Sequence, residues 1–183
     1  NIHERRKLKM KIGKIQKLVS AALLTAIICV ATMVVKIPSP ATNGYFNLGD
    51  CFVLICGWIL GPVYGALAAG IGSALADILS GYAQYAPATF VIKALMALVV
   101  CFIMKKFAGK RRNLSGLCAG FAAETVMVLG YFGYEAVILS YGIAAAGSIP
   151  SNIMQGVIGM ISAFAVFTAI TKSNTLKRFF GKG

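Results

Sequence analysis

Long stretches without a charged side chain limit what this chain can fold into more than any other feature. Residues 51–76 carry no charge, and 58% of the whole chain is hydrophobic while only 13% is charged. Soluble domains do not have this composition, whereas membrane-spanning helices of about 20 apolar residues do. The sequence therefore predicts an all-α integral membrane protein. Because apolar runs continue to the C-terminus, the first run is not expected to be a removable signal peptide.

The positions of the basic residues indicate how many times the chain crosses the membrane. Seven of the 18 lysines and arginines precede the first apolar run, five lie within 105–112, and four lie within 172–183. If 51–76 formed one span, the last two clusters would lie outside, against the preference of basic residues for the cytoplasmic side. A turn at Gly61-Pro62 brings all three clusters into the cytoplasm. We therefore expect six transmembrane helices with both termini cytoplasmic.

These six helices are expected to form one domain. Their predicted limits are residues 18–37, 47–60, 63–79, 87–104, 114–141 and 150–171, with a loop at 39–46. Residues 1–17 are then a basic cytoplasmic segment, 18–171 the bundle, and 172–183 a basic cytoplasmic tail. The second helix rises only about 21 Å, less than the hydrocarbon thickness of about 30 Å. The third carries small residues on two faces, which predicts close packing on both sides.

An acid and a base lie within apolar sequence on either side of a short aromatic turn. Asp77 precedes this turn and Lys93 follows it. An ionisable side chain at mid-bilayer costs roughly 2.5–3.5 kcal/mol, so it normally faces a cavity or a partner. Two interpretations follow: Asp77 and Lys93 form part of a binding site, or they form a buried ion pair that joins the third and fourth helices.

Other polar residues gather toward the outer ends of the predicted helices. Those expected in the outer half are Asn47, Asp50, Asp77, Thr89, Lys93, Tyr131, Tyr134, Glu135, Asn152 and Gln155. Glu124 lies deeper, and the inner halves are almost wholly apolar. A channel or an autonomous carrier would show polar or broken segments through the full thickness. This distribution predicts a binding site open to the outer side, with no polar path continuing inward.

Aromatic residues accompany this predicted site. They are Tyr82, Tyr85, Phe90, Tyr131 and Tyr134. Together with hydrogen-bonding groups, aromatic walls suit a small, flat, polar heterocycle. Tyrosines also form belts at membrane interfaces, and both interpretations stay open for Tyr82 and Tyr85. Tyr131 shares a helical face with two glutamates, which favours the binding site.

Several other functions find no support in the sequence. The chain lacks HExxH, GxSxG and GxxxxGK[ST] motifs, so an enzyme is not expected. The single histidine, His3, lies in the charged N-terminal segment, and the five cysteines have no metal-ligand spacing. The net charge of +13 is concentrated in clusters that flank apolar runs. Such clusters set topology, and they do not indicate nucleic-acid binding.

Motifs from nearly the whole predicted bundle resemble one transporter family. They are Asn47-Leu-Gly-Asp50, Gly61-Pro62, the run from Gly72 to Tyr82, the run from Pro87 to Lys93, the run from Gly130 to Glu135, and the run from Ile149 to Gly156. Together they resemble the substrate-binding S components of energy-coupling factor (ECF) vitamin transporters. The resemblance is greatest to the branch for hydroxymethylpyrimidine, pyridoxine or riboflavin-type cargo.

The resemblance implies a high-affinity binding subunit of an ABC-type importer in the prokaryotic cell membrane, which captures a vitamin or vitamin precursor from outside. The implied partners are a transmembrane coupling subunit and two ATP-binding-cassette ATPases. ATP is used by those partners, and no cofactor is expected on this chain. Ala22 and Ala26 match the family's docking motif for the coupling subunit, although alanines at this spacing also permit ordinary helix packing.

The depth of each polar residue along its predicted helix and the resemblance to S components together give a set of predicted substrate-binding residues. They are Asn47, Asp50, Asp77, Tyr82, Tyr85, Lys93, Tyr131, Tyr134, Glu135, Asn152 and Gln155. The alternative function is a self-sufficient secondary carrier of a small polar solute. In that case Asp77, Lys93, Glu124 and Glu135 would form an intramembrane relay for protons or ions.

Overall fold

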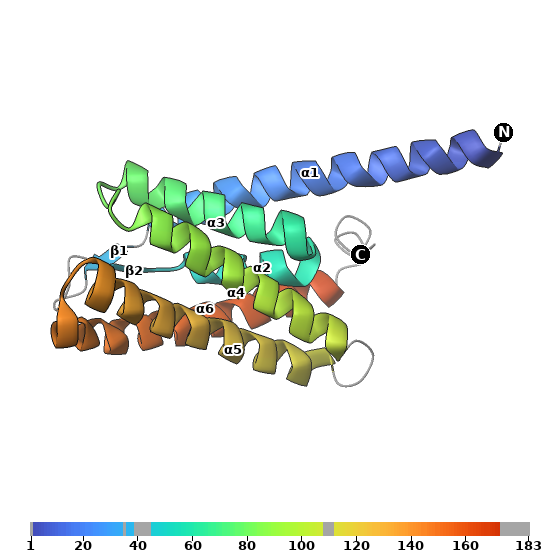
Figure 1. Cartoon of the computed structure of the whole chain (residues 1–183). Helices are drawn as coiled ribbons and strands as arrows, with labels where there is room; N and C mark the ends of the chain where they lie inside the picture. The colour runs from blue at the N-terminus through green and yellow to red at the C-terminus, as the bar shows by residue number, and fades with distance from the viewer. Residues whose placement is uncertain (1, 35, 39–44, 108–111, 173–183) are drawn as a thin grey trace.

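The computed structural model shows six α-helices packed as a bundle (Figure 1). The structure describes residues 2–34, 36–38, 45–107 and 112–172. The helices are α1 Ile2–Val34, α2 Gly49–Ile59, α3 Pro62–Leu79, α4 Ala86–Lys106, α5 Arg112–Gly133 and α6 Ile149–Lys172. Five helical segments are long and apolar enough to cross a membrane, whereas α2 is shorter. The prediction of a six-helix bundle with a short second helix is confirmed.

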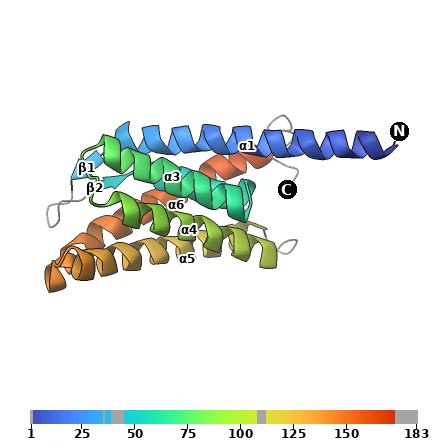
Figure 2. The ribbon, with the colours of Figure 1, turned by 45° about the horizontal axis from the view of Figure 1, so that its top comes forward.

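A two-stranded hairpin marks one end of the bundle. Strand β1 (Lys36–Pro38) pairs antiparallel with β2 (Tyr45–Asn47), and β2 leads into α2. Figures 1 and 2 show this hairpin at one end, while the start of α1 and the end of α6 point toward the other. We call these the hairpin end and the terminal end. The helices α2, α4 and α6 therefore all begin at the hairpin end.

The chain turns between α2 and α3 where the sequence predicts it. Gly61 has a φ of 81°, in the left-handed region that side chains other than glycine rarely adopt. Pro62 is the first residue of α3, a position at which a helix does not need the missing N–H group. These two residues divide the charge-free run 51–76 into two antiparallel helices.

The segment before α2 differs from its prediction. The first helix ends at Val34 and not at residue 37, because residues 36–38 extend to form β1. The predicted loop at 39–46 is wrong at its last two residues, which lie in β2. Residues 39–44 lie outside the described part of the chain.

The end of the fifth helix also differs from its prediction. The expected continuous helix over 114–141 stops at Gly133 and is followed by a π-helical turn, Tyr134–Ile138. Ser140 then has a φ of 59°, and the N–H of Tyr141 donates to the carbonyl of Glu135 at 3.0 Å. Such a conformation cannot continue an α-helix. A 3₁₀-helix, Gly142–Ser148, leads into α6.

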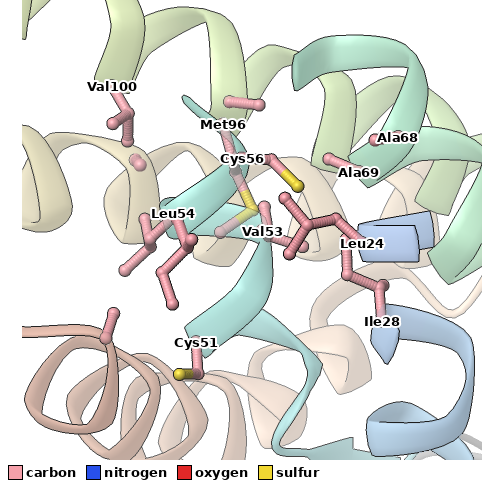
Figure 3. Close-up of a cluster of buried hydrophobic side chains, with 14 of the residues drawn as sticks. Leu24, Ile28, Cys51, Val53, Leu54, Cys56, Ala68, Ala69, Met96 and Val100 are labelled. Atoms are coloured by element: carbon pink, nitrogen blue, oxygen red, sulfur yellow. The ribbon is translucent and has the colours of Figure 1, made fainter. Parts of the chain in front are cut away.

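The short helix α2 carries much of the hydrophobic core. It packs on α1, α3, α4 and α6, and Val53, Leu54 and Cys56 are fully buried. Figure 3 shows Met96 of α4 and Ile28 of α1 reaching the same cluster. Large apolar side chains elsewhere remain exposed on the outside of the bundle, as a lipid-facing surface requires.

Small residues let α3 approach two neighbours closely, as the sequence predicts. A Cβ atom added at Gly65 would lie 2.8 Å from the carbonyl oxygen of Cys56 in α2. One added at Gly72 would lie 2.7 Å from the carbonyl oxygen of Thr25 in α1. Both separations are too short for a real side chain, so these positions set the spacing of α3 from α1 and α2.

Replacement of Gly57 by alanine is expected to destabilise the bundle. A Cβ at this position would lie 2.5 Å from the carbonyl oxygen of Ala97 and 2.7 Å from the Cβ of Val100. Overpacking of this kind typically costs about 1–3 kcal/mol. The matched control is Gly133→Ala, because Gly133 is helical with no atom within 4 Å of its added Cβ. Thermal unfolding in detergent should show a lower Tm for the first variant only.

Candidate binding site

A buried ion pair lies at the centre of the polar residues. The ammonium of Lys93, on α4, contacts the Oδ1 atom of Asp50, in the first turn of α2. Asp50 is fully buried and Lys93 is 2% exposed. Removing two charges from water carries a desolvation cost that only good pairing and further hydrogen bonds offset. The pair is therefore costly to keep and costly to break on one side.

Gln155 of α6 provides the further hydrogen bonds. Its Nε2 atom donates to the second oxygen of Asp50, and its Oε1 atom accepts the backbone N–H of Asn47 at 2.8 Å. The sulfur of Met127, on α5, lies 3.2 Å from both Lys93 Nζ and Gln155 Nε2. Four helices and β2 thus meet at one point through Asn47, Asp50, Lys93, Met127 and Gln155, which we call the central cluster.

A smaller contact lies toward the hairpin end. The hydroxyl groups of Thr89, on α4, and Tyr131, on α5, are 3.0 Å apart. The Lys93 ammonium lies 5.5 Å from the centre of the Tyr131 ring, within the range of a cation–π interaction. Tyr131 therefore joins the central cluster to the next group of polar residues.

That next group surrounds Glu135 at the start of the π-helical turn. The hydroxyl of Tyr85 donates to Oε1 of Glu135 at 3.2 Å, and the hydroxyl of Ser148 donates to Oε2. The Tyr134 hydroxyl donates to the backbone carbonyl of Gln84, and the rings of Tyr85 and Tyr134 lie 6.0 Å apart. Helix α5 and the segment before α6 are thereby tied to the α3–α4 turn.

These groups form a continuous polar column. One side is formed by Tyr85, which directly precedes α4, and by Thr89 and Lys93 on α4; the other side is formed by Glu135 in the π-helical turn and by Tyr131, Met127 and Glu124 on α5. Residues three or four apart share one helical face, so each turn adds one polar contact. The column runs from the hairpin end into the bundle and ends at Glu124. Its two bounding helices, α4 and α5, pack against each other.

Three predicted site residues, Asp77, Tyr82 and Asn152, are not members of this column. Asp77 is buried in the last turn of α3, where its backbone carbonyl accepts the N–H of Tyr82 at 2.8 Å. Asn152 is buried on α6, three residues before Gln155. The structure pairs Lys93 with Asp50, and the interpretation in which Asp77 pairs with Lys93 stays a prediction.

The prediction that the Phe90 ring lines the binding site is wrong, and two residues that contact the site's polar groups were not predicted. The ring of Phe90 packs over Gly70 of α3 and is 36% exposed, so it does not join the column. Met127 and Ser148 were not predicted. Both belong to residue types that are common inside apolar helices and turns, and only the contact with a polar partner distinguishes them.

The two alanines predicted for docking face away from the bundle. Ala22 and Ala26 are exposed on α1, whereas Ala21, Leu24 and Ile28 on the opposite face are buried. The alternative interpretation, in which this alanine pair packs on another helix of the same chain, is therefore not supported. Their role in docking stays a prediction.

The fold and the polar column define a membrane-embedded binding protein. Apolar helices surround a polar column that starts at one end and stops inside the bundle. Residues 11–172 match the family described as the ECF-type riboflavin transporter, S component, and the chain belongs to that family. It is a substrate-binding S component of an ECF transporter, a multi-pass protein of the prokaryotic cell membrane, and not an enzyme.

Two further proteins are similar to this chain. An "uncharacterized protein in gap 3'region" of Pyrococcus woesei is 39% identical over 134 residues, which cover 73% of this chain and 87% of that protein. A solved structure described as "Structure and mechanism of the S component of a bacterial ECF transporter" superposes with a TM-score of 0.71. It is 24% identical and covers 87% of this chain and 97% of its own, and it supports the fold.

Proposed function

We propose that this chain captures a vitamin-type heterocycle in its polar column and passes it to an ECF module. Riboflavin is the first candidate because the matching family carries that description. Hydroxymethylpyrimidine and pyridoxine are the other candidates. Capture is from the outer side, and a transmembrane coupling subunit with two ATP-binding-cassette ATPases supplies the energy from ATP. The chain itself needs no cofactor for this role.

The central cluster is the observation that carries the proposal. Asp50 offers an acceptor, while Lys93 and Gln155 offer donors, all from different helices. The flavin ring presents an imide N–H between two carbonyl oxygens, and one acceptor with two donors can complement this pattern. Pyrimidine and pyridine rings with hydroxymethyl groups also present mixed donors and acceptors. Tyr131 and Tyr134 add aromatic surface on which any of these rings can stack.

Mass spectrometry of small molecules released from the denatured, purified protein tests the proposal. A flavin released in stoichiometric amount, followed by saturable binding of riboflavin, would establish riboflavin as the cargo. A pyrimidine or pyridine compound would assign the chain to one of the other two cargo types. Absence of any bound heterocycle, together with no binding of the three compounds in titration, would contradict the proposal.

Replacement of Glu135 by glutamine is expected to weaken binding about tenfold. The change keeps the shape of the side chain but removes the charge that accepts hydrogen bonds from Tyr85 and Ser148. Without the charge, the two hydroxyl groups are held less firmly at the column, and a cost to binding of about 1.4 kcal/mol is a tenfold change in affinity. Isothermal titration with the compound that the unmodified protein binds measures this. Thr125→Val, at a hydroxyl on the exposed face of α5, should leave the affinity unchanged.

A further inference from the structure

Glu124 is a buried carboxyl group whose role is not explained by the contacts of the central cluster. It is 7% exposed, and neither of its oxygens has a hydrogen-bond partner among the residues that the structure describes. Buried polar groups nearly always have a partner, because an unmade hydrogen bond in an apolar environment is costly. An unpartnered carboxyl at the inner end of the polar column therefore indicates a partner that arrives under other conditions.

The surroundings of Glu124 place it beside the central cluster. An added Cβ at Gly159 of α6 would lie 2.8 Å from the Cβ of Asp50 and 3.5 Å from Oε1 of Glu124. Both acids thus lie next to the same glycine. Oε2 of Glu124 lies 3.1 Å from an added Cβ at Gly156, so the carboxyl group packs directly against the α6 backbone.

Lys93 lies close to both acids. Its ammonium contacts Asp50 and lies 3.2 Å from the sulfur of Met127. Met127 follows Glu124 by three residues on α5, so the two side chains share a face and their Cβ atoms are about 5–6 Å apart. The lysine side chain has four flexible methylene groups, which allow its ammonium to move over such a distance.

Both carboxylate oxygens of Asp50 already have a partner in this structure. One oxygen meets Lys93, the other meets Gln155, and the amide oxygen of Gln155 meets Asn47. A molecule that enters the column can engage Asp50 only by displacing one of these partners. If the entering molecule displaces Lys93, the lysine ammonium is left buried without an acceptor unless a second acceptor lies nearby.

We propose that Glu124 is this second acceptor for Lys93. When an N–H or O–H group of the cargo donates to Asp50, the Lys93 ammonium moves to Glu124. The exchange keeps the Lys93 ammonium on an acceptor while Asp50 accepts hydrogen bonds from the cargo and from Gln155. The part of this inference that concerns cargo rests on the proposed function, and it restricts the cargo to molecules that carry such a donor. The exchange itself is a property of this chain alone.

A double-mutant cycle on the cargo-free protein tests the exchange. The four proteins are the unmodified chain, Glu124→Met, Asp50→Ala and the double variant, compared by thermal unfolding in detergent. Glu124→Met alone removes an unpartnered polar group, so Tm should stay the same or rise. Asp50→Ala removes the first acceptor and lowers Tm, and Lys93 then depends on Glu124. In that background Glu124→Met should lower Tm by several degrees more.

The change of sign between the two backgrounds is the decisive result. If Glu124→Met has the same effect with and without Asp50, the two acids do not share Lys93 and the inference is overturned. Asp50→Ala combined with Glu124→Gln keeps an oxygen acceptor and should recover part of the lost Tm. A matched control is Ser115→Ala, at a buried polar residue nine positions before Glu124 on α5, which should behave identically in both backgrounds.

Titration of riboflavin tests the step that involves cargo. Glu124→Met should weaken binding at least tenfold while its Tm is not lowered, a combination that a purely structural role does not produce. Unchanged affinity would overturn the cargo step. If the unmodified protein binds no riboflavin, the same titration is made with hydroxymethylpyrimidine and pyridoxine. Failure with all three contradicts the proposed function, and the cargo-free cycle still decides the role of Glu124.

Discussion

Replacement of Lys93 by methionine is expected to abolish cargo binding and to destabilise the protein strongly. Methionine fills a similar volume but leaves Asp50, which is fully buried, without its ammonium. Breaking a buried pair on one side typically costs about 3–5 kcal/mol. For a chain of this length, that corresponds to a Tm lowered by roughly 10 °C. Binding fails as well, because the only cation of the central cluster is lost.

A second variant separates stability from binding. Lys93→Met combined with Asp50→Asn removes both charges, and the new amide oxygen can still accept from Gln155. Neutralising both partners of a buried pair is often harmless to stability. The double variant should therefore recover most of the lost Tm and still fail to bind. Recovery of binding together with Tm would mean that Lys93 holds the fold and takes no part in recognition.

The sequence was sufficient to predict the architecture because topology in a membrane depends on few variables. Apolar length predicts helices, and the basic clusters indicate an even number of crossings. Gly61 and Pro62 then fix the turn. The β-hairpin and the π-helical turn were not predicted, since both depend on local backbone pairing that leaves no periodic signal in three to five residues.

The sequence indicated the members of the polar column other than Met127, but it did not indicate how they pair. Depth along each helix indicated which polar residues lie at one end of the bundle. Whether Lys93 meets Asp50 or Asp77 depends on how closely α2 and α4 approach, and that approach is made possible by Gly57 against Ala97. No pattern within a single helix contains this information. For the same reason the lack of a partner for Glu124 emerges only from the packed structure.

Cargo identity is the least predictable property for a physical reason. The same donors and acceptors at Asp50, Lys93 and Gln155 satisfy a flavin imide, a pyrimidine or a pyridine. Discrimination among such rings depends on the shape that the column adopts around the bound molecule. In the structure described here these groups satisfy one another, so cargo binding must rearrange them.

Insertion of tryptophan at Ala22 or Ala26 is expected to abolish uptake while leaving cargo binding unchanged. Both alanines lie on the exposed face of α1, opposite the face that carries Leu24 and Ile28 into the core. A bulky ring on that face does not disturb the bundle, but it prevents another helix from approaching at the short distance that small residues permit. We expect uptake by cells that contain the complete ECF module to fall more than tenfold, with the affinity of the purified chain within about twofold of the original.

The control for this prediction lies on the same helix. Leu23 is 51% exposed and points to a different side of α1 from Ala22 and Ala26. Leu23→Trp adds the same ring at the same depth, and it should leave both uptake and binding nearly intact. Normal uptake by the two alanine variants would show that the coupling subunit docks elsewhere. Loss of binding in those variants would show that α1 influences the polar column, although none of the column's hydrogen bonds described above involves α1.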